Sequence, residues 1–126
     1  MTLDKKLKVF LIEDAYRIRS VLTDILQQAG DVEVVGFAEN EQDALQQLRT
    51  KEWDVAVVDI ALREGSGLAV LAGLKNDARQ YGKRLVFTSS PSSALKARSL
   101  ALGADGFFDK SRDMTTLVHR IQDMAR

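Results

Sequence analysis

Short apolar runs rich in branched residues alternate along this chain with longer stretches in which an apolar residue recurs every third or fourth position. The short runs predict β-strands at residues 8–12, 32–37, 55–59, 84–88 and 106–109. Three of these runs contain almost no polar residue, which is typical of parallel strands that are covered by helices on both faces. A sheet with one face in water would alternate apolar and polar residues instead.

The longer stretches predict five amphipathic helices. The first covers residues 15–29, and the other four begin near Asn40, Gly67, Pro91 and Asp113. Pro91 is predicted to occupy the first helical position behind Ser90 as the N-cap, and Gly103 is predicted to end that helix.

Strands and helices that alternate with short connections predict a three-layer α/β fold, in which five βα units form a doubly wound parallel five-stranded sheet. The chain has 126 residues and contains no linker or low-complexity tract. We therefore expect residues 1–126 to form a single domain.

Charge and composition argue against several classes of function. Eighteen basic residues balance eighteen acidic ones, so direct nucleic-acid binding by this chain is not expected. No apolar run approaches the roughly 20 residues that cross a bilayer, and Glu13 and Asp14 interrupt the first run where a signal peptide would continue. We expect a cytoplasmic protein without membrane association. The absence of cysteine excludes a thiol nucleophile and a zinc–thiolate site.

Polar side chains gather at the carboxyl ends of the predicted strands, where open α/β sheets bind ligands. They are Glu13 and Asp14 after the first strand, Asp59 at the third, Thr88 and Ser89 at the fourth, and Lys110 after the fifth. Two carboxylates about 4 Å apart repel by about 4 kcal/mol at an effective dielectric constant of about 20. A cation is therefore expected, and Mg²⁺ prefers oxygen ligands of this kind.

Asp59 is the candidate nucleophile, because a carboxylate beside such a cation can attack a phosphoryl donor and form an aspartyl phosphate. Thr88 can donate a hydrogen bond to one phosphoryl oxygen, and Lys110 can pair with another. Ala61 and Ser90 are small, uncharged and predicted to flank the position from which water would attack. We expect them to tune the rate of dephosphorylation.

Four segments together resemble a known family: VFLIED at 9–14, VVDIAL at 57–62 with Gly67 and Leu68 beyond it, LVFTS at 85–89, and GADGFFDK at 103–110. In order and spacing the chain resembles, over almost its whole length, the receiver domain of bacterial response regulators, which has the chemotaxis-regulator or flavodoxin-like fold. The resemblance implies the strand order 2-1-3-4-5. It also implies a signalling phosphoacceptor rather than an enzyme, which takes its phosphoryl group from a sensor histidine kinase or a histidine phosphotransfer protein.

The resemblance further implies roles for individual residues. Mg²⁺ or Mn²⁺ would be bound by Asp14, Asp59 and the backbone carbonyl of Ala61, with Glu13 acting through a metal-bound water. The residues implied to hold the phosphoryl group, or to respond to it, are Thr88, Ser89, Lys110 and Phe107. The fourth helix, fifth strand and fifth helix would then change shape and engage a downstream protein, an output domain or a second copy of the chain.

Two residues depart from the family pattern. Arg63 and Ser111 stand where family members usually carry proline. Arg63 is predicted to loosen the loop beside the metal. Ser111 removes the sequence reason for a cis peptide bond that helps to aim the lysine, since a cis bond without proline costs roughly 2.5 to 4 kcal/mol. The departure at Ser111 therefore bears first on the placement of Lys110.

Other functions known for this fold class need features that the sequence lacks. A phosphatase of the haloacid-dehalogenase type would need a second aspartate two residues after the nucleophile, where Ala61 stands. A flavin or nucleotide binder would need a Gly-rich phosphate loop, and none follows a predicted strand. The principal alternative is a receiver-like interaction module that is not phosphorylated, which Arg63 and Ser111 favour.

Several further residues are interpreted as structural. Trp53 is predicted to pack at the sheet edge, and His119 is predicted to lie on the surface. Arg17 and Arg19 are interpreted as part of the solvated face of the first helix.

Overall fold

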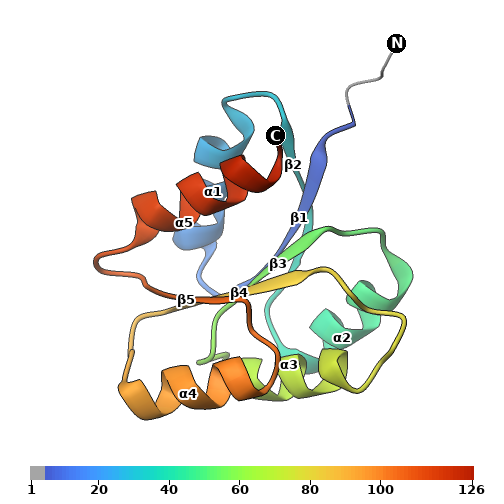
Figure 1. Ribbon diagram of the computed structural model, residues 1–126, viewed down its shortest axis with the longest axis vertical. Coiled ribbons are helices and arrows are strands. Elements are labelled where there is room, and N and C mark those ends of the chain that lie inside the picture. Colours follow the sequence, from blue (N-terminus) through green and yellow to red (C-terminus); the bar gives the residue numbers. More distant parts are fainter. Residues whose placement is uncertain (1–4) are drawn as a thin grey trace.

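The computed structural model describes residues 5–126, in which five parallel strands alternate with five helices (Figure 1). The strands are β1 (Leu7–Ile12), β2 (Val32–Ala38), β3 (Val55–Val58), β4 (Lys83–Thr88) and β5 (Gly106–Asp109). The helices are α1 (Tyr16–Gln27), α2 (Glu41–Thr50), α3 (Gly67–Lys75), α4 (Ser93–Ala101) and α5 (Met114–Met124). The sheet order is β2-β1-β3-β4-β5, which confirms the predicted three-layer fold and its strand order.

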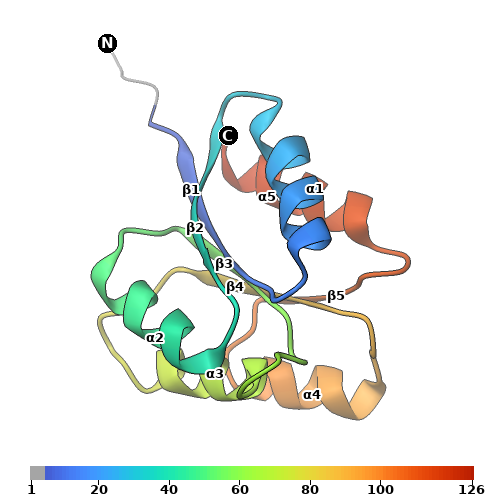
Figure 2. The same ribbon diagram turned by 180° about the vertical axis from the view of Figure 1, so that it is seen from behind.

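The sheet separates two hydrophobic clusters. Helices α1 and α5 cover one face, and α2, α3 and α4 cover the other (Figures 1 and 2). Because side chains alternate along a strand, Val9 and Leu11 of β1 pack with α1 and α5, whereas Phe10 and Ile12 pack with α2 and α3. These four side chains are at most 1% exposed, and burial of each contributes about 1.5 to 3 kcal/mol.

The strand register brings the carboxyl ends of the central strands into line. Ile12 pairs with Val58, and Val58 pairs with Val86. Thr88 pairs with Asp109 at the end of the next ladder. The residues that follow β1, β3 and β5 therefore leave the sheet along the same edge.

The helix starts agree with the sequence to within one residue except at α4, and α1 ends at Gln27, two residues before the predicted end at residue 29. The prediction that Ser90 caps this helix and that Pro91 is its first residue is wrong: the N-cap is Ser92, whose hydroxyl accepts a hydrogen bond from the N–H of Leu95 at 3.1 Å. A side chain that satisfies a free N–H fixes the helix start, so Pro91 lies before the cap. Gly103, at a φ of 98°, ends the helix as predicted. None of the helices within residues 5–126 combines the length and the apolar character needed to cross a bilayer.

Helix α4 is attached more lightly than its neighbours. Ser99 is its one buried residue, and Leu100 is 44% exposed. Its half-buried C-cap residue, Leu102, packs against the cluster on the α2 and α3 side. By contrast, α3 buries Val70, Leu71 and Leu74 in the same cluster.

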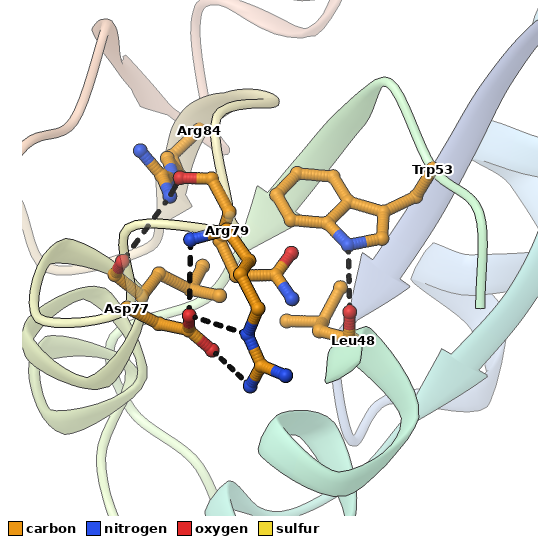
Figure 3. A network of polar contacts seen from close by, with 7 residues as sticks. Leu48, Trp53, Asp77, Arg79 and Arg84 are labelled. Carbon is orange, nitrogen blue, oxygen red and sulfur yellow. Dashed lines mark hydrogen bonds and ion pairs between the residues drawn. The ribbon is translucent and has the colours of Figure 1, made fainter. Parts of the chain in front are cut away.

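At the opposite edge of the sheet Trp53 has the predicted packing role (Figure 3). Its indole N–H donates to the carbonyl of Leu48 at 3.0 Å, and the guanidinium of Arg84 lies 6.0 Å from the ring centroid. A Cβ on Gly82 would lie 2.5 Å from the indole ring, so glycine is required for this close approach. A hollow of about 660 Å³ opens beside Trp53 and Tyr81, far from the polar residues at the carboxyl edge.

Candidate functional site

Three carboxylates meet at the carboxyl edge of the sheet. Glu13 and Asp14 follow β1, Asp59 follows β3, and one oxygen from each residue lies within 4.8 Å of the others. The N–H of Asp59 donates to the carbonyl of Ile12 at 2.9 Å, and the N–H of Glu13 donates to the carbonyl of Ala38 at 3.0 Å. The sheet ladder thus continues into the cluster and fixes its backbone. Glu13 and Asp59 are each only 4% exposed, whereas Asp14 is half-buried.

The ammonium of Lys110 reaches the same cluster. Its Nζ lies 2.7 Å from Oε1 of Glu13 and 3.0 Å from Oδ2 of Asp59. The N–H of Lys110 donates to the carbonyl of Thr88 at 2.9 Å, so the neighbouring strand carries the lysine to the edge. Every peptide bond in residues 5–126 is trans, including the bond between Lys110 and Ser111. The departure at Ser111 has therefore not displaced the ammonium from the carboxylates.

Lys110 alone does not neutralise the negative charge of the cluster. One ammonium among three carboxylates leaves an excess of two negative charges. Burial raises the pKa of Glu13, and the charge of Asp59 adds to this effect against the opposing hydrogen bond from Lys110. Burial acts to lower the pKa of Lys110, but the hydrogen bonds to Glu13 and Asp59, together with the negative charges of these two residues, outweigh burial and raise that pKa. The site is thus suited to oxygen-liganded divalent cations.

Hydrogen bonds hold the loop from Asp59 to α3 at several points, and the loosening of this loop by Arg63 stays a prediction. The N–H of Gly67 donates to the carbonyl of Ile60 at 2.9 Å, and a Cβ on Gly67 would overlap the carbonyl oxygen of Asp59. The N–H of Ser66 donates to Oε1 of Glu41 at 3.1 Å. The loop around the exposed Arg63 is therefore tied to the start of α2 as well as closed on itself.

The other predicted residues surround the cluster at different depths. Thr88 is 1% exposed at the end of β4, and its hydroxyl accepts a hydrogen bond from the N–H of Ser90 at 3.3 Å. Ser89 and Ser90 are exposed, as is Ala61 beyond Asp59. The N–H of Ala61 donates to Oδ1 of Asp59 at 3.2 Å. Phe107 is half-buried and packs against the cluster on the α2 and α3 side.

Arg19 is a residue that the sequence interpretation misplaced. The sequence predicts it on the solvated face of α1, but it is buried. Its Nη1 donates to the carbonyl of Glu13 at 2.8 Å and to Oε2 of Glu39 at 2.9 Å, and its guanidinium lies 4.0 Å from the ring centroid of Phe37. Arg19 therefore ties the acidic turn to the end of β2. The sequence spacing does indicate that Arg19 faces the core, because Leu22 follows Arg19 by three positions and lies on the same helix face.

The comparison with known families decides what this fold and site belong to. A family model described as "Response regulator receiver domain" matches residues 9–122. The chain belongs to the response regulator receiver family. It is thus a receiver domain of two-component signalling, and its acidic cluster is consistent with a phosphorylation site.

Relatives of this receiver domain extend beyond the matched segment. The protein-glutamate methylesterase/protein-glutamine glutaminase 1 of Methanospirillum hungatei is 32% identical over 113 residues, which are 88% of this chain and 33% of the relative. The protein of the same name from Geobacter metallireducens is 32% identical over 125 residues, covering 95% of this chain and 34% of the relative. The receiver domain therefore spans about a third of the length of these curated relatives.

Solved structures confirm the receiver fold. The signal receiver domain of the putative response regulator NarL from Mycobacterium tuberculosis is similar with a TM-score of 0.86 and 26% identity, covering 96% of this chain and 97% of that one. The Mn²⁺-bound form of response regulator Rcp1 is similar with a TM-score of 0.77 and 21% identity, covering 94% of this chain and 91% of that one.

Proposed function

We propose that this receiver domain accepts a phosphoryl group on Asp59 from a sensor histidine kinase or a histidine phosphotransfer protein in the cytoplasm. The observation that carries the proposal is the position of Asp59. Its carboxylate is almost completely buried, lies beside two further carboxylates and contacts the ammonium of Lys110. Two like charges at this distance do not stabilise an aspartate that has only a structural role. A phosphoacceptor, by contrast, needs neighbouring carboxylates that can bind a metal ion, and a fixed positive charge such as the Lys110 ammonium.

The proposed reaction is a phosphoryl transfer. A carboxylate oxygen of Asp59 attacks the phosphorus of the donor and forms the new O–P bond, while the bond to the donor's leaving group breaks and that group takes the electron pair. Lys110 pairs with one phosphoryl oxygen and Thr88 donates a hydrogen bond to another, with Ser89 beside it at the rim. These two contacts hold the acyl phosphate in the pocket.

The residues present fit a divalent cation, Mg²⁺ or Mn²⁺. Asp14, Asp59 and the carbonyl of Ala61 are the proposed direct ligands, and Glu13 is proposed to bind through a water. All are hard oxygen donors, as these ions prefer, and the excess negative charge of the cluster favours their binding. A bound cation would neutralise charge on the transferring group. The Mn²⁺-bound form of Rcp1, which shares this fold, supports the assignment.

The proposed output surface is formed by α4, β5 and α5. Phe107 is half-buried on β5, the strand that the lightly attached α4 contacts, and phenylalanine can change rotamer without leaving a buried hydroxyl unpaired. Motion of Phe107 and α4 would alter the surface offered to a downstream protein, an output domain or a second copy of the chain. Relatives three times as long as the matched segment support an output carried outside this domain.

Phosphorylation by a small donor tests the proposal directly. With Mg²⁺ and acetyl phosphate, intact-mass spectrometry should show the purified protein gaining the mass of one phosphoryl group, and a chelator should prevent the gain because the carboxylates then lack their cation. A receiver of known activity is labelled in parallel. If that control is labelled and this protein keeps its unmodified mass, the domain is an interaction module, as the departures at Arg63 and Ser111 favour.

The lifetime of the phosphorylated form is expected to depend on Ala61 and Ser90. Both residues are exposed beside the cluster, so Ala61→Gln and Ser90→Gln should change the decay rate several-fold by positioning or excluding the attacking water. Ala94→Gln, on the exposed surface of α4, is the matched control. The measurement is loss of the phosphorylated mass after removal of the donor, and decay at the unsubstituted rate in both variants would contradict the placement.

A further inference from the structure

The turn that follows β5 is closed by one side chain. Oδ1 of Asp109 accepts a hydrogen bond from the N–H of Ser111 at 2.9 Å and another from its hydroxyl at 2.8 Å. These two bonds bridge the residues on either side of Lys110. The pKa of Asp109 is lowered by the same contacts, first the N–H and then the hydroxyl of Ser111.

The backbone of Asp109 is held equally firmly. Its N–H donates to Oδ2 of Asp113 at 2.9 Å, and its carbonyl accepts from the N–H of Arg112 at 3.2 Å and from that of Asp113 at 2.8 Å. Lys110 itself donates its N–H to Thr88. The backbone before and after the lysine is therefore fixed, and the Asp109 carboxylate is the group that fixes the residue after it.

We infer that Asp109, through its two hydrogen bonds to Ser111, is a positioning residue that aims the Lys110 ammonium at Asp59 and Glu13. The inference rests on the proposed phosphoryl transfer to Asp59. Lys110 has four rotatable side-chain bonds and reaches a target 3.0 Å from its Nζ, so a small rotation of the turn would carry the ammonium out of contact. Displacement of a catalytic group by about 1 Å can cost about a hundredfold in rate.

The carboxylate suits this role because it holds a trans turn that has no proline to stiffen it. An Asp side chain that binds the N–H two residues on forms a compact turn of its own. The hydroxyl of Ser111 adds a second bond to the same oxygen, and threonine at this position would keep that bond. Alanine at 111 would retain the N–H donor and lose only the hydroxyl.

Four variants and one double-mutant cycle test the inference with the full chain. Asp109→Ala should slow phosphorylation by acetyl phosphate by about tenfold to a hundredfold, and Ser111→Ala should have a smaller effect that Ser111→Thr restores. Arg112→Ala, an exposed neighbour, is the matched control and should keep the unsubstituted rate. Thermal unfolding of each variant reports separately on stability.

The cycle with Lys110→Ala distinguishes aiming from general support of the fold. If Asp109 acts through the lysine, Asp109→Ala should have almost no further effect once Lys110 is alanine, because residues that act together are not additive. Equal effects of Asp109→Ala in both backgrounds would overturn the inference. A second result would also overturn it. If the ammonium protons of Lys110 stayed protected from exchange with water in Asp109→Ala, as seen by NMR, the ammonium would still have its stable hydrogen bonds without Asp109. Failure of the unsubstituted protein to be phosphorylated would instead contradict the proposed function.

Discussion

Asp59→Asn is expected to abolish phosphoryl uptake completely while leaving the fold intact. Asparagine has nearly the volume of aspartate and can keep the hydrogen bond from the N–H of Ala61, but its amide is not a nucleophile and cannot form an acyl phosphate. Intact-mass spectrometry after incubation with Mg²⁺ and acetyl phosphate measures the result. Circular dichroism measures whether the fold is retained.

Asp24→Asn is the matched control, because it removes the same charge from an exposed position on α1. This variant should be phosphorylated like the unsubstituted chain. Retention of one phosphoryl group by Asp59→Asn would show that another residue is modified, and would contradict the assignment of Asp59 even if the protein is a genuine phosphoacceptor.

Gly67→Ala is expected to lower the free energy of unfolding by about 3 kcal/mol, at the upper end of the usual cost of overpacking. The added Cβ would overlap the carbonyl of Asp59, and backbone cannot move aside as a flexible side chain can. The displaced Asp59 should also react more slowly with acetyl phosphate. Urea unfolding and the phosphorylation rate measure the two effects on the same variant.

A second glycine of α3 provides the control for this substitution. At Gly73 the new Cβ would meet only the end of the Leu45 side chain, and alanine is favoured over glycine in a helix by about 1 kcal/mol. Gly73→Ala should therefore cost little or increase stability. If Gly67→Ala were as stable and as active as Gly73→Ala, the close packing of α3 on the Asp59 loop would not constrain the site.

The sheet and the convergence of the acidic residues could be predicted because both follow from local pattern. Continuous apolar runs such as 55–58 identify buried parallel strands, and parallel strands must deliver Asp59 and the Glu13–Asp14 pair to one edge. The roles of these residues in metal binding and phosphoryl transfer stay predictions.

Features that depend on tertiary contacts could not be predicted in the same way. Arg19 is charged, so its burial depends on Phe37 and Glu39 lying beside it. Phe37 belongs to β2, and Glu39 follows directly after that strand. Sequence alone does not identify the N-cap of α4, because residues 89, 90, 92 and 93 are all serine, and only the bond from Leu95 distinguishes Ser92. The aim of Lys110 depends on hydrogen bonds that sequence does not show.

The division of the core into two clusters also bears on how such a domain can diversify. Helix α4 buries a single residue, whereas α1 and α5 complete a separate cluster on the far side of the sheet. Displacing α4 therefore exposes little apolar surface, and its cost is small beside that of global unfolding. Substitutions on the outward side of α4 can change partner preference while the opposite half of the core preserves the architecture, so specificity can drift without a matching loss of thermostability.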